Sequence, residues 1–212
     1  MSSRERILET LRQGKRPFPP INPPLFYHPM TPVADDSPAA LLARFVVEAQ
    51  KAACVVHQAQ TPEAAIGVVL QLLGAETAVS AWDPAHIPIP GLADALEKAG
   101  KRLVGQDAAV RVGLTGVDAA LAATGSVVVM SGNGRWRAAS LLPPVHIAVV
   151  QSSQIVPNLE SWWAAQKAAG LEHTRQRSNI VVITGPSRTA DIAMQLVMGM
   201  HGPQELHLIL LN

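Results

Sequence analysis

The sequence contains little of what several classes of functional site require. Its 212 residues include one cysteine, Cys54, which alone can neither close an internal disulfide nor hold an iron–sulfur cluster. Cys54 stands in the apolar run Ala-Cys-Val-Val and is predicted to be a buried small apolar residue. No HxH, HExxH or Cys-His spacing is present, so we predict no tightly bound metal and no cofactor held through cysteine.

Charge and aromatic side chains are also scarce. Charged residues make up 16% of the chain, the formal net charge is +1, and aromatic residues make up 4%. Without a basic block or interleaved basic and aromatic residues, nucleic-acid binding has no support. The longest uncharged stretch, residues 138–159, is interrupted by prolines, and the amphipathic N-terminus lacks the apolar core of a secretory signal. We therefore expect a soluble cytoplasmic protein without a membrane span.

The chain is rich in apolar residues, at 48%, and their pattern alternates between two periods. Helices are expected to begin at Ser37, Thr61 and Leu92, and a further helix is expected over residues 156–169. Strands are expected over residues 53–57, 76–81, 102–104, 127–130, 145–150, 180–183 and 206–211, and a mobile polar loop over 170–178. Strands that alternate with helices predict an α/β fold with a mostly parallel sheet covered on both faces.

The first 34 residues differ from the rest. Ser2 and Glu5 form a capping-box pattern at the start of a helix that ends at Gly14. A proline-rich segment with interspersed aromatics, Pro17 to Pro32, follows and is expected to be extended. We predict residues 1–34 to be a helix and a strap, and residues 35–212 to be the α/β domain. The strap is expected to lie on its own domain, and a partner surface is the alternative.

Residues 179–203 contain the most distinctive local pattern. A run of β-formers predicts a buried parallel strand, which Thr184-Gly185-Pro186 ends. Ser187 or Thr189 then predicts the cap of a helix over the apolar residues that follow. The free N–H groups of a helix start, together with Arg188, suit an anion. The alternative is an ordinary capped helix with Arg188 in solvent, because neither the P-loop lysine nor GxGxxG spacing is present.

Four polar, glycine-containing clusters follow predicted strands, where ligands gather in open α/β sheets. The candidate ligand-binding residues within them are Thr115, Thr124, Gly125, Ser126, Asn133, Arg135, Gly185, Ser187, Arg188 and Thr189. The candidate catalytic residues are Asp118, Asp191 and His146, with His201 as a further acid or base. The alternatives are that these clusters are ordinary turns, that Asp191 only favours a helix dipole, and that a lone histidine is a core residue. Of Trp162 and Trp163, one is expected in the core and the other at the surface or against a partner.

Three segments resemble a known family. GLTGVDAALAATGSVVV, LLPPVHIAVV, and above all TGPSRTADI followed by GMHGPQELHLILL are similar to the LUD (lactate utilisation domain) family, nearest its lactate utilisation protein C type. These segments cover most of the C-terminal half, whereas the first half matches only as a pattern of elements. The family usually has acidic residues at two positions where this chain has Ala123 and Ala193. Their absence here argues against a mechanism that relies on those carboxylates.

The resemblance implies a NagB/RpiA/CoA-transferase-like three-layer fold, similar also to formyltetrahydrofolate cyclo-ligase. It further implies a part in oxidising L-lactate to pyruvate beside two partner proteins that carry the iron–sulfur clusters, which agrees with the single cysteine. The leading hypothesis is therefore a non-iron–sulfur subunit of a cytoplasmic L-lactate dehydrogenase system that binds a small anionic ligand at the strand–helix turn. The alternatives are a free-standing enzyme acting on a phosphorylated or acyl metabolite and a non-catalytic assembly subunit. A nucleotide or a coenzyme A-like molecule stays open as the ligand.

Overall fold

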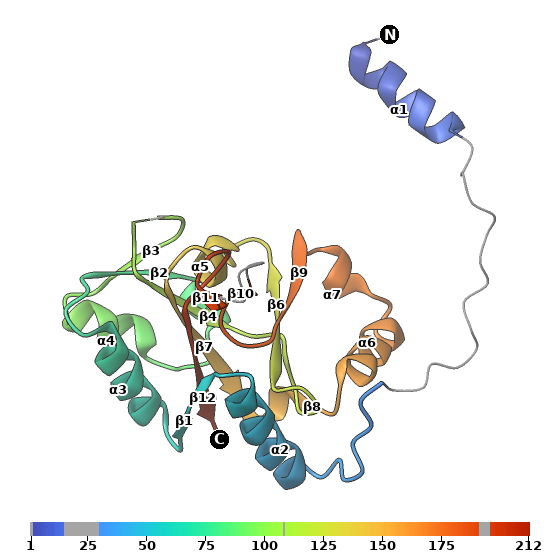
Figure 1. The fold of residues 1–212 in the computed structure, drawn as a ribbon. Helices are drawn as coiled ribbons and strands as arrows, with labels where there is room; N and C mark the ends of the chain where they lie inside the picture. Colours follow the sequence, from blue (N-terminus) through green and yellow to red (C-terminus); the bar gives the residue numbers. More distant parts are fainter. Residues whose placement is uncertain (1, 15–29, 108, 191–195) are drawn as a thin grey trace.

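The computed structural model describes residues 2–14, 30–107, 109–190 and 196–212, which form two sheets and the helices around them (Figure 1). The central sheet has six strands in the order β1-β12-β7-β4-β2-β3, and every neighbouring pair is parallel. The predicted α/β class with a mostly parallel sheet is confirmed. The strands are β1 (Val55–Ala59), β2 (Ala78–Ala81), β3 (Arg102–Val104), β4 (Val112–Gly116), β7 (Val145–Gln151) and β12 (Glu205–Leu211).

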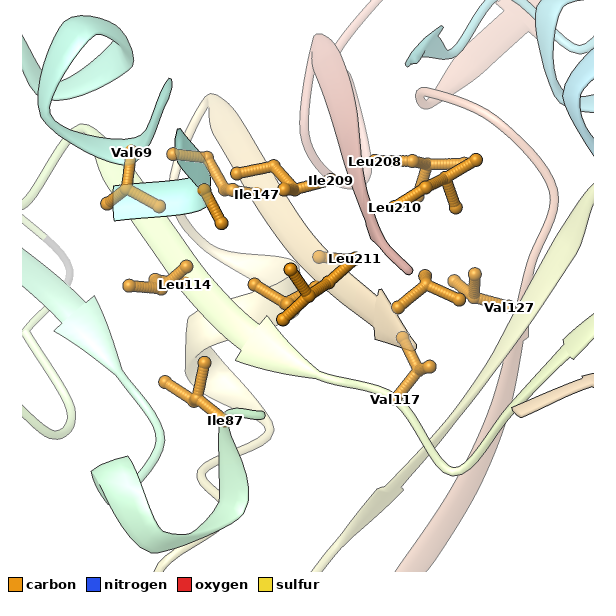
Figure 2. Close-up of a cluster of buried hydrophobic side chains, with 14 of the residues drawn as sticks. Val69, Ile87, Leu114, Val117, Val127, Ile147, Leu208, Ile209, Leu210 and Leu211 are labelled. Carbon is orange, nitrogen blue, oxygen red and sulfur yellow. The ribbon is translucent and has the colours of Figure 1, made fainter. Parts of the chain in front are cut away.

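The middle strands are mostly apolar because both of their faces are buried. Successive side chains of a strand point to opposite faces. Figure 2 shows the result for β12: Leu208 and Leu210 lie on the side of Val127, whereas Ile209 lies with Ile147 on the side of Val69. The core of the protein therefore lies on both sides of this sheet.

Helices α3 (Pro62–Leu73) and α4 (Leu92–Lys98) cover one face of the central sheet (Figure 1). Helix α3 begins where the sequence predicts, because the Thr61 hydroxyl accepts the N–H of Ala64 and proline occupies the first turn. Its buried stripe of Ala65, Val69 and Leu73 packs on the sheet. Two shorter helical segments, η1 (Pro84–His86) and α5 (Ala138–Leu141), follow β2 and β6.

The second sheet has four strands in the order β8-β5-β6-β9. Its strands are β5 (Ala119–Leu121), β6 (Ser126–Ser131), β8 (Ile155–Val156) and β9 (Asn179–Ile183). β6 pairs antiparallel with β5 and β9, and all six of its residues are buried. Helix α2 (Pro38–Lys51) packs at the end of this sheet, because its Ala49 backbone lies against Gly125 in the turn between β5 and β6.

Helix α6 (Leu159–Ala168) covers the outer face of the second sheet. Asn158 caps it by accepting the Ser161 N–H, and Trp162 packs on Leu121, Val128 and Met130. Trp162 is 5% exposed and Trp163 is 36% exposed, which confirms the prediction of one core and one surface tryptophan.

Near the N-terminus, α1 (Ser3–Gln13) has the predicted capping box, in which the Ser2 hydroxyl accepts the Glu5 N–H. None of its residues is buried. The predicted strap falls mostly outside the described residues, so its expected packing stays a prediction, as do the predicted domain limits. Where the description resumes, the Met30 N–H donates to Glu160 at 2.9 Å and Asn158 donates to the Thr31 carbonyl at 3.3 Å.

The stretch 179–203 differs from its prediction. β9 is not a buried parallel strand: it lies at the edge of the second sheet, antiparallel to β6, and alternate side chains are exposed. Instead of a helix, residues after the turn form an antiparallel pair, β10 (Arg188–Ala190) and β11 (Leu196–Met198). The expected cap fails because the Ser187 hydroxyl accepts the N–H of His201 rather than that of a following helical residue. Residues 191–195, which include Asp191, lie outside the described residues.

Three further elements differ from the sequence prediction. The segment 170–178, expected to be a loop, contains the short helix α7 (Glu172–Arg175). The expected helix over 156–169 begins only at Leu159, because Val156 pairs with Leu121 in β8. The buried strands β4 and β5 were not predicted from the sequence. Among the described helices, none combines the length and the hydropathy that crossing a membrane needs.

Candidate functional site

The four predicted loop clusters meet in two pairs, one at each end of β6. At the start of β6, the Ser126 hydroxyl lies 2.7 Å from the hydroxyls of both Thr124 and Thr184. At its end, Asp118 accepts the Met130 N–H and a guanidinium N–H of Arg135. Because β6 has six residues, the two ends are about 17 Å apart. The clusters therefore do not form a single pocket.

A cleft of about 260 Å³ lies at the first of these ends. β9, the turn after it, the loop before β12 and the region of α5 provide its walls. The lining residues are Arg137, Ser140, Leu141, Val181, Val182, Ile183, Thr184, Gly185, Ser187, His201, Gly202 and Pro203. Half of them belong to the two segments, TGPSRTADI and GMHGP, that carry the strongest family resemblance.

Glycine at position 185 allows the turn to lie directly on the end of α2. Gly185 has a φ of +83°, and a Cβ there would approach the Ala52 carbonyl oxygen far more closely than 3.0 Å. The next segment is held by backbone hydrogen bonds, since the Ser187 N–H donates to the Pro203 carbonyl at 2.8 Å. The turn and the loop before β12 are thus joined into one wall of the cleft.

The charged side chain in the described lining of the cleft is a cation. Among its described lining residues there is no Asp or Glu, whereas Arg137 and His201 both contribute cationic or proton-donating side chains. Neither the Arg137 guanidinium nor the His201 ring pairs with any other described residue. An exposed guanidinium binds a carboxylate through two parallel N–H groups. The arrangement can therefore hold a small anion, with the Thr184 and Ser187 hydroxyls as additional partners.

A larger hollow of about 390 Å³ lies elsewhere, between residues 84–94 and Gln151. Prolines and aliphatic side chains dominate its lining, and Asp94 is its one charged residue among those described. It has no cation to receive an anionic ligand, so the smaller cleft is the better candidate on chemical grounds.

Arg188 has a structural contact in this structure. Its guanidinium donates to the Ala52 carbonyl at 3.3 Å, at the C-terminal end of α2. Neither Arg188 nor Thr189 is among the residues that line the cleft, and the expected helix start is a strand. Burial raises the pKa of the nearby Cys54 thiol to about 11, although the Gly185 N–H and the Arg188 charge act in the opposite direction. Cys54 is buried, as predicted.

The second pair of clusters forms a polar network rather than an open pocket. Asp118 is buried between Arg135 and the ring of His173, whose Nε2 lies 3.4 Å from the carboxylate. Arg135 lies over the Trp82 ring, 4.8 Å from its centroid, and Arg177 donates to His173. The network connects the end of β4 to the end of β6 and to α7. Of its members, the sequence analysis found Asp118 and Arg135 but missed His173 and Arg177, because it expected a loop there.

The remaining candidates lie apart from both groups. His146 is fully buried, and its Nε2 lies 2.9 Å from the hydroxyl of Thr115. Burial lowers the pKa of His146 to about 4. Asn133 is exposed in the turn after β6. No described group of three His, Cys, Asp or Glu side chains is placed to hold a metal ion.

Arg137 was missed by the sequence analysis. It stands outside the glycine clusters, two residues after Arg135, and no spacing rule marks it. The one signal in the sequence was that Arg137 lies close before the segment LLPPVHIAVV, which resembles the family. Arg137 precedes the short helix α5, and this position brings it to the cleft.

Comparison with known proteins places the chain in a family. The model of the LUD domain family matches residues 42–211. A lactate utilization protein C from Halalkalibacterium halodurans is 35% identical over 150 residues, which cover 66% of this chain and 65% of that protein. One from Macrococcus caseolyticus is 44% identical over 94 residues, which cover 43% and 40%. The chain thus spans less than two thirds of the length of these relatives.

A solved structure has the same fold. The crystal structure of a DUF162 family protein from Deinococcus radiodurans matches with a TM-score of 0.58 and 22% identity, and the match covers 83% of this chain and 99% of that one.

Proposed function

The chain belongs to the LUD domain family, and on that premise we propose that it takes part in lactate utilisation by binding a small carboxylate in the cleft beside β9. The proposed system is the cytoplasmic oxidation of L-lactate to pyruvate. The proposed partners are iron–sulfur subunits that would receive the electrons. The names of the curated relatives support the general role, and the cleft supports the ligand class.

One observation carries the ligand class: the cleft has an arginine and a histidine whose side chains pair with no described residue, and none of its described lining residues is a carboxylate. Because the Arg137 guanidinium is exposed and pairs with no described residue, its positive charge is available to a ligand. A carboxylate would pair with both Arg137 N–H groups at once and offset this charge. A volume of about 260 Å³ also suits a metabolite of a few heavy atoms better than a large cofactor.

The hydroxyls beside the arginine favour a hydroxy or keto acid over a simple carboxylate. Thr184 lines the cleft and continues through Ser126 to Thr124 by two hydrogen bonds of 2.7 Å. Such a chain can reverse the direction of its hydrogen bonds, because each hydroxyl both donates and accepts. Thr184 can then donate to a keto oxygen or accept from a hydroxyl group of the ligand. L-Lactate and pyruvate, which differ in that group, both fit this chemistry.

Isothermal titration of the full chain with L-lactate and with pyruvate tests the proposal. We expect binding with a Kd of about 1 mM or lower, and a loss of about tenfold or more in Arg137→Gln, the scale of one charge-assisted hydrogen bond. Arg175→Gln, which removes an exposed arginine outside the cleft, is the matched control and should bind normally. Equal binding by both variants would place the ligand elsewhere. Binding of coenzyme A or a nucleotide, but of neither acid, would favour the free-standing enzyme.

A further inference from the structure

The edge of the second sheet formed by β9 differs from the other sheet edges of the described chain. β8 has two residues, β3 has three and includes an arginine, and β1 carries His57 and Gln58. β9 has five residues, Asn-Ile-Val-Val-Ile, without proline or charge. Soluble proteins usually protect a sheet edge by short length, charge, proline or a bulge, because its free N–H and C=O groups pair with other chains. β9 has none of these protections.

The side chains of β9 are also incompletely covered. Ile180 and Val182 point to the same face as Met130 and Val128, their partners on β6. Those partners are buried under Trp162, yet Ile180 is 39% exposed and Val182 is 42% exposed. The apolar face of the second sheet therefore extends past the part that Trp162 of α6 covers. A strand added beside β9 would bury both side chains and satisfy the free backbone groups together.

The charge around β9 indicates what kind of strand fits. The last three residues of β9 line the cleft with Arg137 and His201, and no described residue in that lining is acidic. The β9 strand of a second copy would itself be uncharged and carry no carboxylate for Arg137. A strand with acidic residues at one end would place its apolar part along β9 and its carboxylates at the cleft.

We propose that β9 is the docking edge for an extended segment of a different protein, an apolar β-strand that ends in acidic residues beside Arg137. The added strand would extend the four-stranded sheet by main-chain hydrogen bonds, a recurring mode of peptide recognition. It would also close the open side of the cleft. The backbone edge and the apolar face carry the added strand independently of the proposed carboxylate ligand, whereas its acidic end rests on the same charge of Arg137 in the cleft.

The test uses the full chain and fluorescein-labelled peptides, with binding followed by anisotropy. The probe is the acetylated peptide TVTVTVTDE, and the comparison peptides are TVTVTVTKK and TVTPTVTDE, whose central proline interrupts the backbone ladder. We expect the acidic peptide to bind about tenfold or more tightly than either comparison peptide. Arg137→Gln should lower the affinity for the acidic peptide alone, to about the affinity of the lysine-ended peptide.

The matched protein variants are Val182→Glu on β9 and Val55→Glu on β1, which replace the same residue type at similar exposure on two sheet edges. Binding should fall by about tenfold or more in Val182→Glu and be unchanged in Val55→Glu. Equal binding of the proline peptide, or an equal effect of both valine variants, would overturn the proposal. Sedimentation of the chain alone as a dimer that Val182→Glu dissociates would assign the edge to a second copy instead.

Discussion

Replacement of Gly185 by alanine tests the contact that holds the cleft against the body of the protein. Two costs arise at this position. Alanine at a φ of +83° adopts the left-handed conformation, which costs about 1–2 kcal/mol. Its Cβ would also collide with the Ala52 carbonyl oxygen, a backbone atom that cannot move without shifting the end of α2. Relief of such overpacking typically costs a further 1–3 kcal/mol, so we expect a total loss of about 2–5 kcal/mol.

Gly170→Ala separates the two costs. Gly170 has a similar φ of +77°, but no atom lies within 4 Å of the position of its Cβ. This variant should therefore lose only the conformational part, about 1–2 kcal/mol. Urea denaturation of both variants and the parent, followed by tryptophan fluorescence, gives the free energies of unfolding. If Gly185→Ala lost no more than Gly170→Ala, the close approach of the turn to α2 would be refuted.

Three further expectations concern buried groups. Burial lowers the pKa of His146 to about 4, so as the pH falls the unfolded protein binds a proton at this residue before the folded protein does. The free energy of unfolding should therefore fall by on the order of 3 kcal/mol between about pH 6.5 and pH 4. His146→Gln should flatten that part of the pH profile, measured by urea denaturation. Trp162→Ala should cost about 3–5 kcal/mol in the same assay and Trp163→Ala clearly less; equal losses would contradict their different burial. Asp118→Asn should lower the free energy of unfolding by about 3 kcal/mol or more, because it leaves the Arg135 charge unpaired. A double-mutant cycle with Arg135→Met that shows no coupling would disprove the ion pair.

The parallel sheet could be predicted because its evidence is local. β7 and β12 are mostly apolar runs, and Thr61-Pro62 marks a helix start whichever way the chain folds afterwards. The same local rules misplaced β9. An apolar run of β-branched residues looks alike whether it is buried on both faces or lies at an edge, and the difference depends on the neighbours that the fold supplies. The NagB/RpiA-like label stays a prediction.

The site was predicted only in part for the same reason. Gly185, Ser187 and His201 belong to motifs, and they do line the cleft. The expected helix start failed because Ser187 has a tertiary partner, His201, that its local pattern does not reveal. Arg137 is an ordinary exposed arginine in sequence terms, and only the packing of α5 on β4 brings it to β9. The ligand roles of the candidate residues stay predictions.

The position of β12 has a consequence for how the protein forms during synthesis. Residues 205–211 pair with β1 on one side and β7 on the other, so the strand made last among those described lies inside the central sheet. Until it leaves the ribosome, β1 has no described strand to pair with, and the apolar faces of β7 and α3 are only partly covered. Such exposed strand edges in a nascent chain favour aggregation and the binding of chaperones. The central sheet can therefore close only after residues 205–211 have emerged.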